Sequence, residues 1–256
     1  MAVTKILSVG GSIVAPEKPD VEFIRRFTAM IRSWMEEDQD RRLILVVGGG
    51  GPARAYQKAY LEIISDSSVS SAGKNSDNSG KDKTGKNDPK SNECGSEADW
   101  IGIMATRLNA QLLKACVGHL CAQEVVYNPL SVDEFKGRIL VAAGWKPGFS
   151  TDNDAVLLAE RFNADTVINL SNIEKVYTDD PKTNPDARPI DLITWKDFCK
   201  MVGDEWTPGK NTPFDPIASK KAQSLGLTVI CASGKNIENI KNILDGKEFT
   251  GTRIKG

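Results

Sequence analysis

The stretch that most constrains this chain is Leu43–Arg54, in which five apolar residues lead directly into four glycines and then Pro-Ala-Arg. A short apolar run rich in β-branched residues predicts a buried strand, and glycines let the backbone turn at positive φ close to a ligand. Pro52 suits the first turn of a helix, where its missing N–H has no partner. A strand, a glycine turn and a helix N-terminus together favour anion binding. Arg54 adds a forked cation suited to phosphate.

Composition sets limits on the class of protein. The chain has 256 residues, 40% of them hydrophobic and 26% charged, which is enough for one large core and predicts a single domain over residues 1–256. A formal net charge of −1 argues against nucleic-acid or membrane partners. There is no apolar run of membrane-spanning length, and the first residues enter a strand without a signal-peptide pattern. We therefore expect a cytoplasmic protein.

The cysteines and the single histidine exclude several kinds of site. The five cysteines contain no C-x-x-C pair, and buried thiols are the simplest interpretation of Cys94, Cys116, Cys121, Cys199 and Cys231. His119 is the one histidine, which argues against a histidine-rich metal site and against a Ser-His-Asp triad.

Strand and helix patterns alternate along the chain. Asp20 is a plausible N-cap for the first long helix. Strands are expected at 4–9, 42–47, 121–127, 138–143, 165–170 and 227–231, and helices at 20–38, 52–64, 101–117, 154–162, 194–202, 216–225 and 236–245. This alternation predicts an α/β fold, a three-layer sandwich with a mainly parallel sheet and helices on both faces.

One segment interrupts the pattern. Residues 66–98 are rich in Ser, Gly, Asn, Asp and Lys, and Val69 is their only large aliphatic residue. Such a stretch cannot bury enough apolar area to offset its ordering entropy. We expect a disordered polar insertion within the domain, because the α/β alternation continues on both sides of it.

The glycine turn admits more than one interpretation. Gly48, Gly50 and Ala53 fit the dinucleotide pattern G-x-G-x-x-A, but the acidic residue expected about 20 residues later would fall in the polar insertion. The chain has no G-x-x-x-x-G-K-[ST] phosphate loop. A second turn, Gly10-Gly11-Ser12, follows the first strand. Two such turns in one sheet could hold two phosphates face to face, although two tight strand–helix turns would look the same.

Two further segments are candidates for the site. Residues 144–156 carry a Pro-Gly turn followed by Ser150 or Thr151 as helix caps, with Asp152 and Asp154 at the helix mouth. Plain N-capping would explain one or two of these residues. Residues 169–181 form a polar loop at the carboxyl end of a strand, which is where ligands of open α/β sheets bind.

Taken in order, these motifs resemble the amino-acid kinase superfamily, and within it uridylate (UMP) kinases of the archaeal type. The resemblance covers everything except the insertion. It is carried by Gly-Gly-Ser at 10–12, Val-Val-Gly-Gly-Gly-Gly-Pro-Ala-Arg at 46–54, Asp-x-Ile-Gly-Ile-x-x-Thr-Arg-x-Asn-Ala at 99–110, Pro-Gly-x-Ser-Thr-Asp at 147–152, Asn-Ile-x-x-Val-Tyr-x-x-Asp-Pro at 172–181, Asp-Pro-x-Ala-x-Lys at 215–220 and Gly-Thr-x-Ile at 251–254. Each motif alone is weak, but the ordered set is specific.

The resemblance implies phosphoryl transfer from ATP, with Mg²⁺, to UMP, and a homo-oligomer, either a hexamer or a dimer. It implies that Gly10, Gly11, Gly49 and Gly50 line the phosphate path and that Arg54 holds the UMP phosphate. It further implies acceptor contacts from Asp99, Gly102, Thr106, Ser150 and Thr151, a catalytic Asp152, and an ATP pocket formed by Asn172, Tyr177, Asp180 and Pro181. No metal ion bound directly by the protein is implied.

Departures from the family pattern leave alternatives open. Many family members carry a lysine where Ser8 stands, so Lys210 and Lys220 become candidate catalytic cations, with Lys175 as a further one. Isopentenyl phosphate kinases share the fold but have a histidine after the glycine loop, where this chain has Pro-Ala-Arg. A molybdate or tungstate storage relative of the same fold, or a kinase for another small acidic acceptor, remains as the alternative function.

Overall fold

The computed structural model describes residues 4–71, 89–203 and 212–256. Within them, the central sheet has the strand order β3-β2-β1-β4-β8-β9-β7. Its pairs are parallel except β8–β9. The strands are β1 (Thr4–Val9), β2 (Arg42–Val47), β3 (Ile139–Ala143), β4 (Thr166–Ser171), β7 (Leu192–Thr194), β8 (Thr228–Ser233) and β9 (Thr252–Lys255). The predicted mainly parallel sheet is confirmed, and its carboxyl edge carries the loops that form the candidate site.

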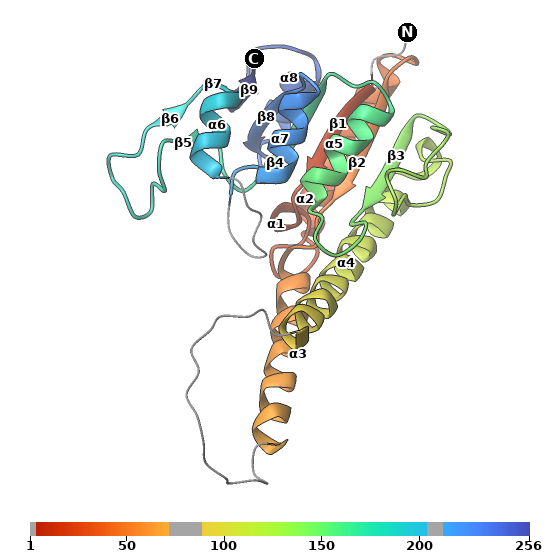
Figure 1. Cartoon of the computed structure of the whole chain (residues 1–256). Coiled ribbons are helices and arrows are strands. Elements are labelled where there is room, and N and C mark those ends of the chain that lie inside the picture. Colours follow the sequence, from red (N-terminus) through yellow and green to blue (C-terminus); the bar gives the residue numbers. More distant parts are fainter. Residues whose placement is uncertain (1–3, 72–88, 204–211) are drawn as a thin grey trace.

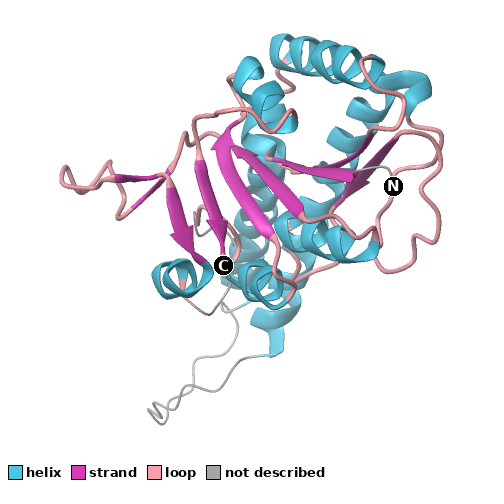
Figure 2. Cartoon of the chain, turned by 90° about the horizontal axis from the view of Figure 1, so that it is seen from above, coloured by secondary structure: helices cyan, strands magenta, loops and turns pink. Residues whose placement is uncertain are grey.

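Helices cover both faces of the sheet, as Figure 2 shows. Alternate strand residues point to opposite sides, so Leu7 packs in one core and Ile6 in the other. One face is covered by α2 (Val21–Glu36), the inner part of α4 (Pro89–Val117) and α8 (Ile237–Leu244), together with the short α1 (Gly11–Val14). The other face is covered by α5 (Thr151–Arg161), α6 (Trp195–Val202) and α7 (Pro216–Ser224). The three-layer sandwich is therefore confirmed.

The helix α3 (Gly50–Ser71) pairs with α4, and the two extend together away from the sheet (Figure 1). They continue well into the segment predicted to be disordered, since 66–71 and 89–98 are helical. The two helices thus overlap both ends of the expected insertion, since a helix started by packed residues can propagate into a polar segment, and the insertion itself stays a prediction. Residues 72–88, the middle of the expected insertion, lie outside the described part.

Most element boundaries agree with the predictions to within two residues, and Asp20 caps α2 by accepting a hydrogen bond from the backbone N of Phe23. The strand expected at 121–127 is wrong. That segment follows a 3₁₀ turn, η1 (Gly118–Leu120), and makes only isolated bridges through Cys121 and Val126. Its apolar residues serve the core beside β3 rather than a ladder. Sequence reasoning also missed β7, β9 and the hairpin of β5 (Val176–Tyr177) and β6 (Pro189–Ile190).

Two smaller expectations can be examined in the described residues. The thiols of Cys121 and Cys231 are free and buried, as expected, whereas Cys116 is only half-buried. None of the helices in the described ranges is both long and apolar enough to cross a membrane.

Candidate active site

The two glycine turns lie against each other at the carboxyl ends of β1 and β2. A Cβ added to Gly11 would lie 2.0 Å from the backbone N of Gly50, and one added to Gly48 would lie 2.4 Å from the N of Gly11. Gly50 has φ +70°, and its Cβ would lie 2.2 Å from the carbonyl oxygen of Ala15. These glycines are therefore required by backbone packing as well as by any approach of a phosphate. The result places the N-termini of α1 and α3 side by side.

A buried side chain from α4 holds the second turn in place. Asn109 is only 4% exposed, and its Nδ2 donates to the carbonyl oxygens of Gly48 (2.9 Å) and Gly49 (3.1 Å). Gly10 is fixed on the other side, since its backbone N donates to the carbonyl oxygen of Leu170 on the neighbouring strand. Asn109 was part of a motif in the sequence but received no role, because a polar residue inside a helical pattern gives no signal of its partner.

Arg54 lies exposed on the first turns of α3, as expected for a phosphate ligand. Its Nη2 is 3.4 Å from the carbonyl oxygen of Pro16, in the loop before α2. Arg54 also borders a hollow of about 500 Å³ along α3, lined further by Gln57, Lys58, Leu61, Glu62 and Ser65. The guanidinium keeps most of its donors available near the helix N-terminus.

The predicted acceptor residues of α4 face the loop after β3. Thr106 is buried, and its Oγ1 accepts a hydrogen bond from the N of Gly144 (2.8 Å). Asp99 accepts from the N of Gly148 through Oδ2 (3.1 Å). Gly102 serves packing, since a Cβ there would lie 2.5 Å from Nε2 of Gln57. The structure thus brings Asp99, Gly102 and Thr106 together along one helix face.

The start of α5 follows the same loop. We call residues 99–109 of α4, together with Ser150 and Thr151 at the start of α5, the acceptor wall. Ser150 is the N-cap, and its Oγ accepts a hydrogen bond from the N of Asn153 at 3.2 Å, while Thr151 is the first helical residue. The capping explanation of Ser150 is therefore observed. Both side chains are half-buried. They follow directly after the loop that Asp99 and Thr106 anchor.

Asp152 joins three elements at the base of the site. Its Oδ1 accepts from Oγ of Ser8 at 2.9 Å, and its Oδ2 accepts from the N of Asp215, the N-cap of α7, at 3.3 Å. Burial raises the pKa of Asp152 to about 6, opposed by the hydrogen bond from Ser8. Ser8, on β1, is itself buried. At the position where a lysine was expected from the resemblance, this chain has a hydroxyl that binds the aspartate.

Asp154 is a buried carboxylate, only 1% exposed. Its Oδ2 accepts from the N of Trp145 at 3.2 Å, and its Oδ1 has no hydrogen-bond partner in the described structure. Burial is the main cause that raises the pKa of Asp154 to about 7, and the nearby charge of Asp152 adds to it. From the sequence alone, Asp154 was expected only to be a carboxylate at the mouth of a helix.

The predicted ATP residues lie along a different part of the fold, beyond the end of β4. Tyr177 belongs to β5, and Asp180 and Pro181 lie in the exposed turn between β5 and β6 (Figure 1). Oδ1 of Asp180 accepts from the N of Lys182 at 2.9 Å, so this carboxylate stabilises its own turn. Asn172 follows β4 directly and is exposed.

The candidate cations that lie within the described residues, Lys175 and Lys220, belong to different parts of the fold. Lys175 forms an ion pair with Asp191. Lys220 is exposed on α7, five residues after Asp215. Lys210 lies outside the described residues. In the described ranges there is no group of three or more His, Cys, Asp or Glu side chains that could hold a metal ion.

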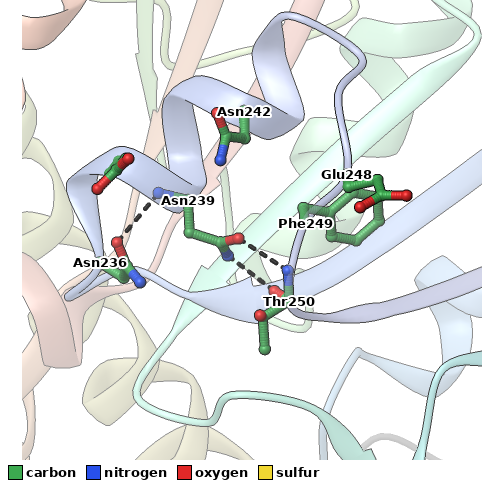
Figure 3. Close-up of a pocket in the computed structure, with 7 residues that line it drawn as sticks. Asn236, Asn239, Asn242, Glu248, Phe249 and Thr250 are labelled. Atoms are coloured by element: carbon green, nitrogen blue, oxygen red, sulfur yellow. Dashed lines mark hydrogen bonds between the residues drawn. The ribbon is translucent and has the colours of Figure 1, made fainter.

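A hollow of about 350 Å³ lies elsewhere, between α8 and the segment that leads to β9 (Figure 3). The amide of Asn239 bridges the backbone of Thr250, donating to its carbonyl oxygen (2.7 Å) and accepting from its N (2.8 Å). Oδ1 of Asn236 accepts from the N of Asn239. These polar groups are used to hold α8 to the following segment, and the hollow contains none of the predicted site residues.

Comparison with known proteins identifies relatives of this chain in sequence and in fold. Residues 4–233 match the model of the amino acid kinase family. The chain is 29% identical over 254 residues to the uridylate kinase of Pyrococcus abyssi, covering 98% of each chain, and 30% identical to that of Methanospirillum hungatei, covering 98% of this chain and 94% of the relative. The crystal structure of uridylate kinase from Archaeoglobus fulgidus superposes with a TM-score of 0.74 at 30% identity, covering 99% of this chain and 100% of that one.

A more distant structure shares the fold alone: UMP kinase from Ureaplasma parvum has a TM-score of 0.67 at 16% identity over the full length of both chains. The glycine turns, the α4 wall and the Asp152 cluster thus occur in a fold that is common to this group. From the match to the family model and the similarity to archaeal relatives over almost its whole length, this chain belongs to the amino acid kinase family.

Proposed function

We propose that this chain is a UMP kinase, which transfers the γ-phosphoryl group of ATP to UMP and yields UDP and ADP. The observation that carries the proposal is the convergence of the α3 N-terminus, the α4 wall and Asp152 on one edge of the sheet. The archaeal relatives named uridylate kinase support the choice of acceptor. They do not favour the storage function or a different acidic acceptor.

The acceptor nucleotide would bind along α3, α4 and the start of α5. Arg54 and the positive end of the α3 dipole would hold its phosphate, because both supply positive charge. Asp99, Gly102 and Thr106 would face the nucleoside part, with Ser150 and Thr151 completing the wall.

The donor would enter from the side of β4 and the β5–β6 hairpin, with Gly10 and Gly11 along the path of its phosphates. Asn172, Tyr177, Asp180 and Pro181 would contact the ATP. Mg²⁺ would arrive on the ATP phosphates, since it keeps several waters and binds substrate phosphates with few protein ligands. The ion would neutralise charge on the phosphates.

Little covalent assistance is needed for such a transfer, because positioning and neutralisation of charge dominate. Asp152, held by Ser8 and by the N of Asp215, would orient groups beside the transferred phosphoryl group. With Ser8 in place of a lysine, backbone N–H groups supply fixed positive dipoles. Lys210 and Lys220 remain the proposed cations of the donor side.

We further propose that the chain forms a homo-oligomer, a dimer or a hexamer, in the cytoplasm. Large apolar side chains recur at every fourth position of α4 and are partly or largely exposed: Trp100 (38%), Met104 (58%), Leu108 (72%) and Leu112 (36%). A continuous apolar stripe of this kind is typical of a protein interface. Free buried thiols such as Cys121 fit a reducing compartment.

Calorimetric titration with UMP, CMP, AMP and GMP tests the proposed function. We expect UMP to bind most tightly, and Arg54→Ala to weaken UMP binding by about 1.5–3 kcal/mol, the typical contribution of a hydrogen bond to a charged group. Lys58→Ala is the matched control, because Lys58 lies one turn further along α3 and pairs with Glu62. Equal affinity for all four nucleotides, or unchanged affinity in Arg54→Ala, would refute the assignment.

A further inference from the structure

The loop Gly144–Phe149 connects β3 to the acceptor residues Ser150 and Thr151, and its backbone is held from two helices. On the α5 side, the N of Trp145 donates to Oδ2 of Asp154 (3.2 Å). On the α4 side, the carbonyl oxygen of Trp145 accepts from Nη2 of Arg107 (3.0 Å). The backbone N–H of Trp145 is therefore bound by an acidic side chain from α5, and its carbonyl oxygen by a basic side chain from α4.

Arg107 is pre-oriented for this contact. Its guanidinium lies 4.3 Å from the ring centre of Tyr127 and 5.7 Å from that of Trp100. Stacking on aromatic rings restricts a planar guanidinium, so that its donors keep a fixed direction. Nε of Arg107 also points to the carbonyl oxygen of Gly144, at 3.4 Å.

Asp154 is expensive to bury, because one of its oxygens accepts no hydrogen bond in the described structure. The positive end of the α5 dipole offsets part of that cost. The charge that acts on Asp154 from nearby is that of Asp152, on the same helix, and it also disfavours the ionised form. In the described structure, the hydrogen-bond donor to this buried carboxylate is the backbone N–H of Trp145 in the loop. Holding the loop in position therefore explains the presence of Asp154 better than a contribution to the stability of the fold does.

The loop held in this way carries side chains toward the acceptor wall. The rings of Trp145 and Phe149 pack edge to face at 4.9 Å, and Nζ of Lys146 lies 4.0 Å from the Trp145 ring centre. Further along, the N of Gly148 is bound by Asp99. Any displacement of Trp145 would therefore move both the aromatic pair and the approach to Ser150.

We propose that Arg107 and Asp154 are positioning residues for the acceptor nucleotide, which fix the Trp145 backbone and through it the loop Gly144–Phe149. The proposal deepens the proposed function and rests on UMP being the acceptor. Neither residue needs to touch the nucleotide. Their effect would be on acceptor affinity rather than on the binding of ATP.

The test uses the full chain with Asp154→Leu, Asp154→Asn and Arg107→Met. Hydrogen exchange is measured for the peptides that cover the loop and, as internal reference, those that cover β1 and β2. Calorimetry gives the Kd for UMP without ATP, and steady-state kinetics gives the KM for each substrate. Lys114→Met is the matched control on α4, because Lys114 pairs with the exposed Glu124 instead.

We expect Asp154→Leu and Arg107→Met to speed exchange in the loop and to raise Kd and KM for UMP about tenfold, with the KM for ATP changed less than twofold. Asp154→Asn keeps an acceptor for the Trp145 N–H, so its effect should be intermediate. Unchanged loop exchange in both Asp154→Leu and Arg107→Met, or equal losses for UMP and ATP, would overturn the proposal. If the unaltered chain binds no UMP, the proposed function fails, and the acceptor role of the two residues fails with it, whereas the exchange data still report whether they hold the loop.

Discussion

The acceptor wall and the β5–β6 hairpin are built in contrasting ways. In the wall, backbone is bound by buried side chains from other elements, as Asn109 binds Gly48 and Thr106 binds Gly144. In the hairpin, the exposed turn satisfies itself, with Asp180 binding the N of Lys182 and Asp179 binding Asn184. The first arrangement fixes geometry through long-range contacts, and the exposed turn relies on contacts within itself.

This difference indicates how the two proposed substrates are recognised. A wall of buried contacts is pre-organised and loses little entropy when a ligand binds. An exposed turn with few tertiary contacts belongs to the less stable part of a fold. We infer that acceptor binding depends on the packing of the whole fold, whereas the donor side depends on a few local residues.

The largest effect is expected from a substitution in the glycine turns beside the wall. Gly50 has φ +70°, and Gly50→Ala places a Cβ 2.2 Å from the carbonyl oxygen of Ala15. The free energy of unfolding should therefore fall by at least about 3 kcal/mol. Gly246→Ala is the control, because it shares φ +70° but has no atom within 4 Å of the added Cβ. That change should cost only about 1 kcal/mol. Urea unfolding measures both, and equal losses would show that packing of the turns contributes nothing.

Asp152, between the two regions, should control the rate. Asp152→Asn is expected to lower kcat about 100-fold, which is the scale of a lost positioning contact. In the unaltered chain kcat should fall as the pH drops through about 6, where the carboxylate of Asp152 gains a proton. Ser8→Ala removes a hydrogen bond that lowers the pKa of Asp152, so it should move this fall to higher pH. A pH profile that is identical in all three proteins would contradict the role of Asp152.

The smallest effect is expected in the hairpin. Asp180→Ala should raise the KM for ATP a few-fold, and it should leave the Kd for UMP and the Tm almost unchanged, because surface substitutions usually alter stability by less than about 0.5 kcal/mol. Asp186→Ala, in the same exposed turn, is the control and should change neither constant. A weaker binding of UMP in Asp180→Ala would show that the two regions are coupled.

The sequence by itself predicted the sheet, the layers and most of the candidate site. Strands such as Arg42–Val47 are continuous apolar runs, and α2 has both a cap and an amphipathic pattern, so local signals were sufficient. The ordered glycine and polar motifs led to Arg54, Asp99, Thr106 and Asp152. Their placement on the carboxyl edge follows from the parallel topology.

Only the tertiary structure decided which groups meet. The contacts of Ser8 with Asp152, of Asn109 with Gly48 and of Asp154 with Trp145 join side chains to backbone or side-chain partners on other elements. The extent of α3 and α4 and the pairing of β9 with β8 and β7 were likewise set by packing. Local patterns report the burial of a residue, but the partner of a buried polar group is fixed by the arrangement of the whole chain.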